Sequence, residues 1–556
     1  MIRRCLAAGS VSLLALLAGP ASADPAVVHF QIDARQDVKP ISRFVYGVNG
    51  ALAGACANCT LTRIGGNRLT AYNWENNASN AGIDWYNQND GLLSSSDAPG
   101  EAVRPGIALA QSKNAGIVVT VPINGYVAAD KSPGGDVNQT PNYLQVRFKQ
   151  ERPAKGAAFT LTPDPNDAYV YQDEFVNWVN HEFPGAQSPD HPVFYCLDNE
   201  PDLWSSTHLR IHPDKTTYAE LVQKTIDYAT AIKNVSPGAL VFGPVNYGWY
   251  GYATLQDAPD AGGRDFQTFW LGQLAAAEQA AGHRLVDVLD VHWYPEATGG
   301  GTRIIGADTT PAVVAARLQA PRSLWDPTYT ETSWITKDST YGPIRLIPRL
   351  FDKIAANDPG AKLAITEYNY GGGGHISGAI AQADALGVFG REGLFAAAEW
   401  PLASEESYIQ AAFLMFRNFD GANGVFGDTS VRATTDDVPD TSIYASLDSG
   451  DPRRMVLVAL NKTGAPIAAS VQVANAGAVG RVHAYQLTGA GAAPVDAGDV
   501  PLGGAQGFLY TLPAYSVSTL ALTVPEPRSG APAALALLLW WRRRYSSDSR
   551  SFASTL

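Results

Sequence analysis

Short apolar runs alternate with longer amphipathic stretches through most of this chain, from about residue 46 to residue 436. The runs that read as strands are Leu61 to Ile64, Ile117 to Val121, Val193 to Leu197, Leu240 to Gly243, Val288 to His292, Ala361 to Thr366 and Leu394 to Trp400. Helix-like stretches such as Tyr218 to Lys233 lie between them. Repeated alternation of this kind is typical of a parallel sheet covered by helices. We therefore predict an α/β fold whose main domain, residues 46–436, is a TIM-like (β/α)8 barrel, with a doubly wound sheet as the weaker alternative.

A different pattern follows the barrel region, in residues 437–523. The strand-like runs there are short and are separated by Gly, Ala and Pro, as in Met455 to Leu460 and Val517 to Thr523. Short β-rich runs at this spacing predict a second, smaller β-sandwich domain. Val27 to Asp33 alternates in the same manner, so residues 24–45 are expected to add one or more N-terminal strands to the sandwich.

Two glutamates stand where predicted barrel strands end. Glu200 follows Val193 to Leu197, and Glu367 follows Ala361 to Thr366. Barrel enzymes carry their chemistry at such strand ends, and only a closed fold brings together two residues this far apart in sequence. A facing carboxylate pair can cleave a glycosidic bond, since one group protonates the leaving oxygen while the other attacks or activates water. The alternative, a solvated side chain or a helix-cap partner, is the weaker interpretation of two such motifs.

Charge and aromatic content narrow the class of substrate. Asp and Glu outnumber Lys and Arg by 53 to 40, so the globular part has no electrostatic case for binding nucleic acid or an anionic membrane. No Gly-x-Gly-x-x-Gly or Walker-type loop is present to hold a phosphate. The chain has 12 tryptophans and 24 tyrosines, and sugar rings stack on such flat apolar surfaces. The candidate sugar-binding residues are Trp74, Trp204, Trp334 and Trp400, each weighed about evenly against core packing.

The first 23 residues have the pattern of a secretory signal peptide. A basic pair precedes the apolar stretch Cys5 to Leu17, and Ala21-Ser22-Ala23 forms an A-x-A cleavage site. Export would place the protein in an oxidising compartment, where Cys56 and Cys59 either pair or remain free. A metal site is the weaker reading of this pair, because a single Cys-x-x-Cys lacks the second pair of ligands that zinc requires.

The tail, residues 524–556, contains a second targeting pattern. Val524-Pro525-Glu526-Pro527 is followed by the apolar run Ala531 to Trp541 and by a cluster of three arginines. This pattern resembles the Pro-Glu-Pro type of C-terminal sorting signal in exported proteins of Gram-negative bacteria, although Tyr545 to Leu556 extend beyond the basic cluster. The resemblance implies a secreted or cell-surface location in a Gram-negative bacterium, with transient membrane or surface attachment through the tail. The alternative is a frayed tail.

Several short motifs in a fixed order resemble glycoside hydrolase family 44. They are Thr62-Arg63-Ile64-Gly65-Gly66-Asn67-Arg68 with Tyr72-Asn73-Trp74, Asp198-Asn199-Glu200-Pro201-Asp202-Leu203-Trp204, Asp290-Val291-His292-Trp293-Tyr294-Pro295 and Thr366-Glu367-Tyr368-Asn369. The resemblance covers about Ala26 to Thr523 and implies a TIM-like barrel with a β-sandwich. It also implies a secreted, retaining endo-β-1,4-glucanase that hydrolyses cellulose-type chains and often xyloglucan, with Glu200 as acid/base and Glu367 as nucleophile.

Other residues of these motifs are expected around the two glutamates. Asn67 and Asn199 are assigned to substrate binding, Asn199 through a sugar 2-hydroxyl. Tyr294 is either a donor that orients Glu367 or an ordinary aromatic at the cleft edge, and His292 is either a cleft residue or a satisfied core histidine. Ile64 stands where relatives often carry Trp, which implies one weaker sugar contact.

The sequence leaves the metal content and the precise substrate open. No cofactor is expected, and no residue is assigned as a metal ligand. A structural calcium ion is compatible with such a fold, but no Asp-x-Asp-x-Asp loop with a distal Glu supports one. The alternatives to a β-glucan substrate are xylan or mannan, or a non-catalytic glycan-binding surface protein that has lost its chemistry.

Overall fold

Eight parallel strands close a barrel in this computed structural model. The structure describes residues 27–524. In chain order the barrel strands are β3 (Gly47–Asn49), β4 (Leu61–Ile64), β7 (Gly116–Val121), β11 (Val193–Leu197), β12 (Val241–Asn246), β13 (Val288–Trp293), β16 (Lys362–Tyr368) and β17 (Ala396–Glu399). The predicted TIM-like barrel is confirmed, and β3 is a strand that the sequence pattern did not predict. The proposed signal peptide (residues 1–23) and the tail from residue 525 onward lie outside the described residues.

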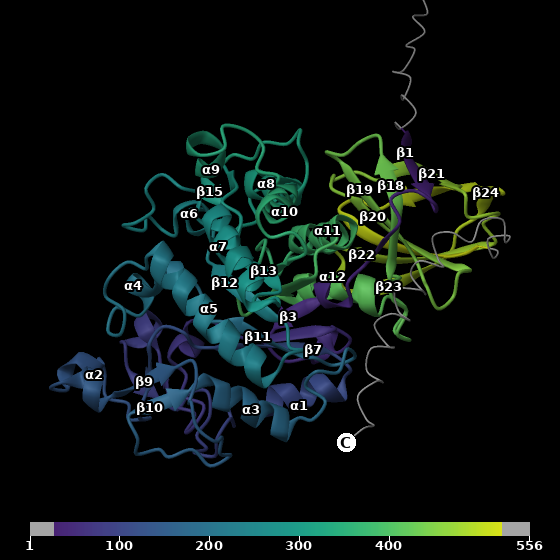
Figure 1. Cartoon of the computed structure of the whole chain (residues 1–556). Coiled ribbons are helices and arrows are strands. Elements are labelled where there is room, and N and C mark those ends of the chain that lie inside the picture. The colour runs from purple at the N-terminus through teal and green to yellow at the C-terminus, as the bar shows by residue number, and fades with distance from the viewer. Residues whose placement is uncertain (1–26, 525–556) are drawn as a thin grey trace, which may run out of the picture.

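Helices surround the barrel (Figure 1). The longer ones are α1 (Arg104–Ser112), α3 (Gln172–Glu182), α5 (Tyr218–Val235), α7 (Phe266–Ala281), α8 (Pro311–Gln319), α10 (Leu346–Asn357), α11 (Ile376–Glu392) and α12 (Ser407–Arg417). The short ones are α2 (Tyr143–Val146), α4 (Trp204–Thr207), α6 (Trp249–Thr254) and α9 (Trp334–Asp338). In α5, Thr217 caps the first turn by accepting a hydrogen bond from the Glu220 N–H, and Leu221 and Ile232 lie on its buried face.

Apolar side chains fill the barrel near the amino ends of its strands. Leu61, Val118, Phe194, Val288 and Ala396 belong to one buried cluster, and each comes from the first half of its strand. Three small sheets sit on the connecting loops: β5 (Ser79–Asn80) with β6 (Asn89–Asp90), β8 (Tyr126–Ala128) with β9 (Phe148–Arg152) and β10 (Tyr169–Tyr171), and β14 (Thr298–Gly299) with β15 (Thr302–Arg303). With the amino end filled, the carboxyl end of the barrel is the end available for a site.

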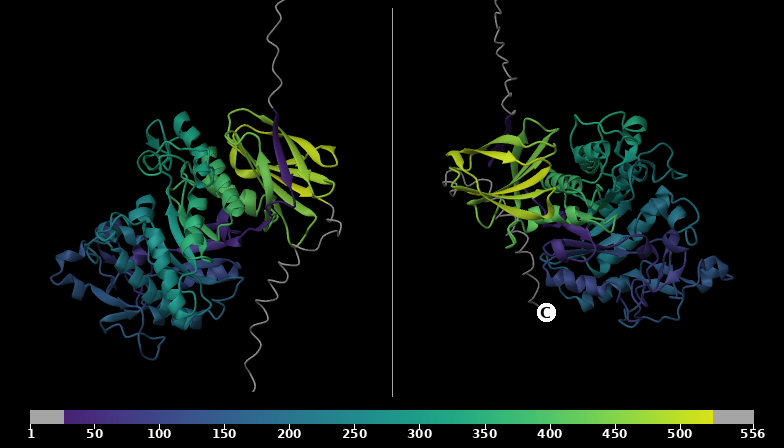
Figure 2. Two further views of the ribbon diagram at one scale, coloured as in Figure 1. Left: turned by 45° about the horizontal axis from the view of Figure 1, so that its top comes forward. Right: turned by 180° about the vertical axis from the view of Figure 1, so that it is seen from behind.

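A second domain is a mixed sheet that lies beside the barrel (Figures 1 and 2). Its strands are β1 (Val27–Asp33), β2 (Lys39–Pro40), β18 (Thr429–Thr435), β19 (Thr441–Leu447), β20 (Arg454–Asn461), β21 (Ile467–Ala474), β22 (Arg481–Thr488), β23 (Gly491–Asp499), β24 (Leu502–Gly504), β25 (Gly507–Leu512) and β26 (Ser516–Thr523). Strand β1 lies between β18, to which it is antiparallel, and β21, to which it is parallel. Residues from both halves of the sheet, including Phe30, Met455, Val471 and Phe508, share one buried core.

The sheet domain packs directly against α11 and α12 of the barrel domain. Asp384 of α11 is buried and forms an ion pair with Lys462 at 2.7 Å, and it accepts a hydrogen bond from the Tyr444 hydroxyl at 2.6 Å. Thr519 of β26 donates to the Met415 carbonyl of α12 at 2.8 Å. Buried polar contacts of this kind hold the two domains in one defined arrangement.

Two smaller observations complete the fold. Cys56 and Cys59 are both buried and both free in this structure, although the backbone N–H of Cys59 donates to the carbonyl of Cys56 at 3.0 Å. Within residues 27–524, no helix combines the length and the apolar character that crossing a membrane requires.

Candidate active site

The turn that carries Glu200 has an unusual backbone. Asp198 and Glu200 adopt φ values of 65° and 47°, a left-handed conformation that costs a non-glycine residue about 1–3 kcal/mol. Asp198 offsets this cost, because its carboxylate accepts hydrogen bonds from the Thr70 hydroxyl, the Trp204 indole and the backbone N–H groups of Ile123 and Asn199. The turn therefore fixes the direction in which Glu200 leaves the end of β11.

Glu367 is held by one donor from β4 and one from the residue that follows β13. Arg63 Nη1 lies 2.6 Å from Glu367 Oε1, and the Tyr294 hydroxyl donates to Glu367 Oε2 at 2.8 Å. The Tyr294 contact is the orienting interaction that was one of its two expected roles. Burial, together with the negative charge of Glu367, raises the pKa of Tyr294, so its hydroxyl stays protonated and continues to donate.

His292 lies between the two carboxyl groups. Its Nδ1 is 2.8 Å from Glu200 Oε1 and 3.5 Å from Glu367 Oε2. One ligand-type atom from each of these three residues lies within 4.8 Å of the others. A carboxyl pair this close fits the spacing of about 5–5.5 Å found in retaining glycosidases and is too short for the 6.5–9.5 Å of inverting ones. The same three groups are near enough to hold an ion, but the spacing equally serves a reacting pair of carboxyls.

The surroundings set the protonation of this group. Burial raises the pKa of Glu200 to about 7; the positive charge of Arg63 opposes this rise and the negative charge of Asp84 adds to it. Burial disfavours the charged form of His292 as well, which lowers its pKa to about 3, so the ring is neutral. Glu200 thus has the properties of a proton donor at neutral pH and below.

Arg63 is the residue of this site that the sequence analysis missed. It is 2% exposed, and in addition to Glu367 it donates to Asn199 Oδ1 at 2.8 Å and to Asn49 Oδ1 at 3.1 Å. Burial alone lowers its pKa, and the nearby negative charges, first that of Glu367, raise it above the usual value. An arginine within the predicted barrel strand Leu61–Ile64 was the available signal, because charged side chains are rarely buried unless they are paired.

Replacing Arg63 with lysine is expected to lower kcat by about 10²–10³-fold, since a point charge cannot reproduce the fork of donors aimed at Glu367 and Asn199. Steady-state kinetics on a soluble β-glucan would measure this loss. Arg68→Lys is the matched control, because Arg68 lies in the same motif but pairs with Asp90 at 2.6 Å. Equal losses in the two variants would contradict the role assigned to Arg63.

The two asparagines expected in the cleft also lie at this site. Asn199 Nδ2 donates to Asn67 Oδ1 at 3.3 Å, and Asn67 Nδ2 donates to Asp84 Oδ1 at 3.0 Å. Asn199 is 3% exposed, whereas Asn67 is only partly buried. Both side chains are therefore connected to Arg63, one directly and one through its neighbour.

Two of the four tryptophan predictions are wrong. Trp74 is 1% exposed and stacks on Phe175 with ring centroids 5.7 Å apart. Trp204 is completely buried, and its indole N–H donates to Asp198. Neither ring can stack on a sugar, because protein atoms cover both. Their contribution is to packing and, for Trp204, to holding the turn that carries Glu200.

The other two tryptophans are partly exposed at strand or helix ends on the carboxyl side of the barrel. Trp400 follows β17 and lies against Gly66, where an added Cβ would come within 2.7 Å of the indole. Trp334 begins α9 and stacks on Tyr250 at 4.5 Å with the rings 18° from parallel. Trp85, which the sequence analysis did not select, is 55% exposed and directly follows Asp84. These positions are compatible with sugar stacking.

The consequence expected of Ile64 is not supported. Its side chain packs toward α1, where a Cβ added to Gly106 would lie 2.7 Å from Ile64 Cδ1. The residue therefore faces a helix outside the barrel rather than the site.

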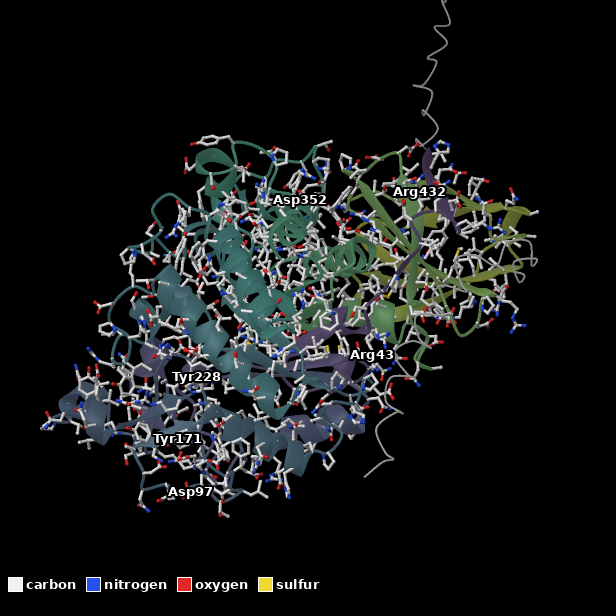
Figure 3. All side chains as sticks on the ribbon, in the orientation of Figure 1. Arg43, Asp97, Tyr171, Tyr228, Asp352 and Arg432 are labelled. Carbon is white, nitrogen blue, oxygen red and sulfur yellow. The ribbon has the colours of Figure 1, made fainter. Side chains whose placement is uncertain are left out.

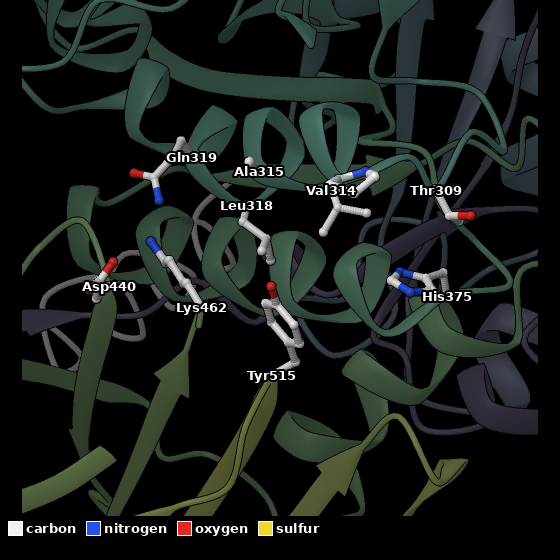
Figure 4. A pocket seen from close by; sticks show the side chains of 10 residues that line it. Thr309, Val314, Ala315, Leu318, Gln319, His375, Asp440, Lys462 and Tyr515 are labelled. Atoms are coloured by element: carbon white, nitrogen blue, oxygen red, sulfur yellow. The ribbon is translucent and has the colours of Figure 1, made fainter. Parts of the chain in front are cut away.

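A hollow of about 400 Å³ elsewhere on the molecule is a separate feature. It lies between α8 and the sheet domain and is lined by residues such as Leu318, Lys462 and Tyr515 (Figure 4). None of the candidate site residues lines it.

Comparison with known proteins agrees with this geometry. The family model for glycoside hydrolase family 44 matches residues 78–297. Endoglucanase A of Paenibacillus lautus is 42% identical over 539 residues, which cover 93% of this chain and 76% of the relative.

Solved structures are similar over nearly the whole described chain. The crystal structure of a family 44 endoglucanase produced by Clostridium acetobutylium has a TM-score of 0.86 at 37% identity and covers 90% of this chain and 100% of that one. A Paenibacillus polymyxa family 44 xyloglucanase, solved with xyloglucan, has a TM-score of 0.85 at 38% identity, with coverage of 90% and 100%. Together with the facing glutamates at the carboxyl end of the barrel, this similarity shows that the chain belongs to glycoside hydrolase family 44.

Proposed function

We propose that the protein is a retaining endo-β-1,4-glucanase that cleaves internal bonds of cellulose-type glucans and of xyloglucan. The observation that carries the proposal is the approach of the Glu200 and Glu367 carboxyls, bridged by His292, to within 4.8 Å. The activities named for the relatives, endoglucanase and xyloglucanase, support the class of substrate. Trp85, Trp334 and Trp400 are the residues that we assign to sugar stacking.

In the first step, Glu200 donates its proton to the glycosidic oxygen while Glu367 attacks the anomeric carbon. The bond between that carbon and the leaving oxygen breaks, and a covalent glycosyl ester forms on Glu367. Arg63 and Tyr294 hold the attacking carboxylate in place through their contacts of 2.6 and 2.8 Å. Asn199 is positioned to hydrogen-bond the sugar 2-hydroxyl, a contact that strengthens in the transition state.

In the second step, the same residues hydrolyse the glycosyl ester on Glu367. Glu200, now a carboxylate, takes a proton from a water molecule, which attacks the anomeric carbon and releases Glu367. Two displacements at one carbon restore its original configuration. The neutral His292 adds no positive charge between the carboxyls. Glu200 acts as the acid while Glu367 is ionised and as the base while Glu367 is esterified.

The pH dependence follows from the requirement that Glu200 carry a proton. We expect kcat/KM to fall as the pH rises through about 7, the pKa of Glu200. Because this pKa lies above the ordinary value of 4.5, the folded state binds more protons than the unfolded state between these two values, and this contribution to stability is lost as the pH rises. We call the fall of kcat/KM at high pH the basic limb. In Glu200→Gln, both the basic limb and the contribution of Glu200 to the pH dependence of unfolding should disappear. An unchanged basic limb in that variant, measured on a substrate with an activated leaving group, would assign the limb to another residue.

Hydrolysis of a panel of polymers tests the proposal. The mature protein would be compared on carboxymethyl-cellulose, xyloglucan, xylan and mannan, following new reducing ends and product lengths. Cleavage of the two glucans into mixed oligomers, with β configuration at the newly formed ends, is expected. Preferential cleavage of xylan or mannan would change the substrate class, and glycan binding without turnover would leave a non-catalytic binding protein.

Export and surface attachment are part of the same proposal. Cellulose-type glucans and xyloglucan are too large to enter a cell. The enzyme that cleaves them therefore has to act outside, as the proposed signal peptide at residues 1–23 implies. The sorting-like tail would serve to retain the enzyme at the cell surface. The mass of the mature protein in culture medium and in membrane fractions would test both processing events.

A further inference from the structure

A chain of directed hydrogen bonds connects the catalytic pair to the rim of the site. It begins at Arg63, which donates to Asn199 Oδ1 at 2.8 Å. Asn199 Nδ2 donates to Asn67 Oδ1 at 3.3 Å, and Asn67 Nδ2 donates to Asp84 Oδ1 at 3.0 Å. Asp84 belongs to the 3-10 helix η4 (Gly82–Trp85), is exposed and forms no ion pair with any residue between 27 and 524.

The two ends of this chain determine its direction. A guanidinium group can only donate hydrogen bonds, and a carboxylate can only accept them. The two asparagine amides between them could face either way in isolation. With an obligatory donor at one end and an obligatory acceptor at the other, each amide must turn its oxygen toward Arg63 and its NH2 group toward Asp84. Asn67 takes one of the two hydrogens on Asn199 Nδ2, which leaves the other for a substrate oxygen.

We propose that Asp84 is a positioning residue of the hydrolytic reaction, because it is the terminal acceptor that fixes the orientation of the Asn67 and Asn199 amides beside Glu200. The inference rests on the proposed function, since Asn199 matters only if a sugar hydroxyl is bound next to the acid/base. Asp84 itself does not touch the reacting atoms and acts through the two amides.

The position of Asp84 has an electrostatic consequence as well. The charged or titratable groups that face Glu200 are Arg63 from β4, His292 from β13, Tyr294 after β13, Glu367 from β16, Asp84 from η4, Tyr247 after β12, Tyr252 from α6 and Asp202 from its own segment. Among the causes that raise the pKa of Glu200, the charge of Asp84 comes after burial, and it opposes the effect of Arg63. Removing this charge therefore lowers the pKa of the acid/base.

Asp84→Asn tests the inference, because asparagine has the same shape but can donate as well as accept. The Asn67 amide is then free to turn over, and we expect kcat to fall about tenfold, the worth of roughly one hydrogen bond, with little change in KM. The basic limb of kcat/KM should move to lower pH. At about 1 M salt the Debye length falls to roughly 3 Å, so the shift of the limb should shrink while the loss in kcat remains.

Two further variants separate positioning from other effects. Asp84→Glu restores the obligatory acceptor and the charge and should return the limb to its original pH. Asp97→Asn is the matched control, since Asp97 (labelled in Figure 3) is an exposed aspartate whose ion pair, with Lys131, lies outside the hydrogen-bonded chain from Arg63 to Asp84, and it should behave as the parent enzyme. An Asp84→Asn enzyme with unchanged kcat and limb, or with a raised KM alone, would overturn the inference. A parent enzyme inactive on every polymer would instead overturn the proposed function.

Discussion

Replacing Glu367 with alanine is expected to lower kcat on a β-glucan by about 10⁴–10⁶-fold, the range typical of removing a catalytic nucleophile. Without this carboxylate, no covalent intermediate can form, and the remaining groups can only bind and polarise the substrate. The change also removes the acceptor shared by Tyr294 and Arg63, which can destabilise the fold. Thermal unfolding would therefore be followed in parallel to show that the variant is folded. The initial rate on a soluble glucan is the measurement.

Azide distinguishes the two glutamates by their roles. In Glu367→Ala, azide can occupy the vacated position and displace the leaving group once, which inverts the anomeric carbon and yields an α-glycosyl azide. In Glu200→Ala, an activated substrate still forms the intermediate on Glu367, and azide then gives a β-glycosyl azide. Glu405→Gln, an exposed glutamate, is the control and should retain full activity. The same azide anomer from both variants would refute the assignment of nucleophile and acid/base.

Replacing Asp384 with alanine is expected to cost about 3–5 kcal/mol of stability, because it leaves the buried ammonium of Lys462 without its counter-charge. The side chains of this pair are 2% and 1% exposed, and the Tyr444 hydroxyl loses its acceptor as well. A fall in the unfolding temperature, measured by calorimetry, is the expected result.

The double variant Asp384→Leu with Lys462→Met separates the ion pair from the packing around it. Replacing both members of a buried pair with apolar groups of similar size is often close to neutral. We therefore expect the double variant to be more stable than Asp384→Ala alone. A double variant at least as unstable as the single one would show that geometry at the interface, and not an unpaired charge, dominates the loss.

Much of the barrel could be predicted because its strands are buried on both faces. Val193–Leu197 is a continuous apolar run, and Lys362–Tyr368 contains the apolar run from Leu363 to Ile365. Such runs are visible without knowledge of their neighbours. Strand β3 was missed because Gly47–Asn49 is three residues long and contains glycine and asparagine, which give no strand signal by themselves. Its place is set by pairing with β17 and β4, which is a property of the closed barrel.

The site was predictable to the extent that its residues end strands. Glu200 and Glu367 could be singled out in this manner, whereas the role of Arg63 depends on Glu367 and Asn199, which lie more than a hundred positions away in the sequence. The tryptophans show that the position after a barrel strand does not by itself predict exposure to the site. Trp204 and Trp400 both follow barrel strands closely, yet one is fully buried against Asp198 and the other is partly exposed. Local sequence does not distinguish them, because burial depends on which loops fold over each ring.

The place of β1 in the sheet has a consequence for synthesis of the protein. Val27 pairs with Ala468, and Phe30 pairs with Thr435, so the earliest described strand has no partner until synthesis has reached β18, at Thr429–Thr435. Contacts of such long range form slowly, and an unpaired strand is prone to aggregate while it waits. A chain that stops before β21 lacks one of the two neighbours of β1, leaving that edge of β1 unsatisfied. An unfinished polypeptide therefore exposes an unpaired strand edge, with which another chain can pair.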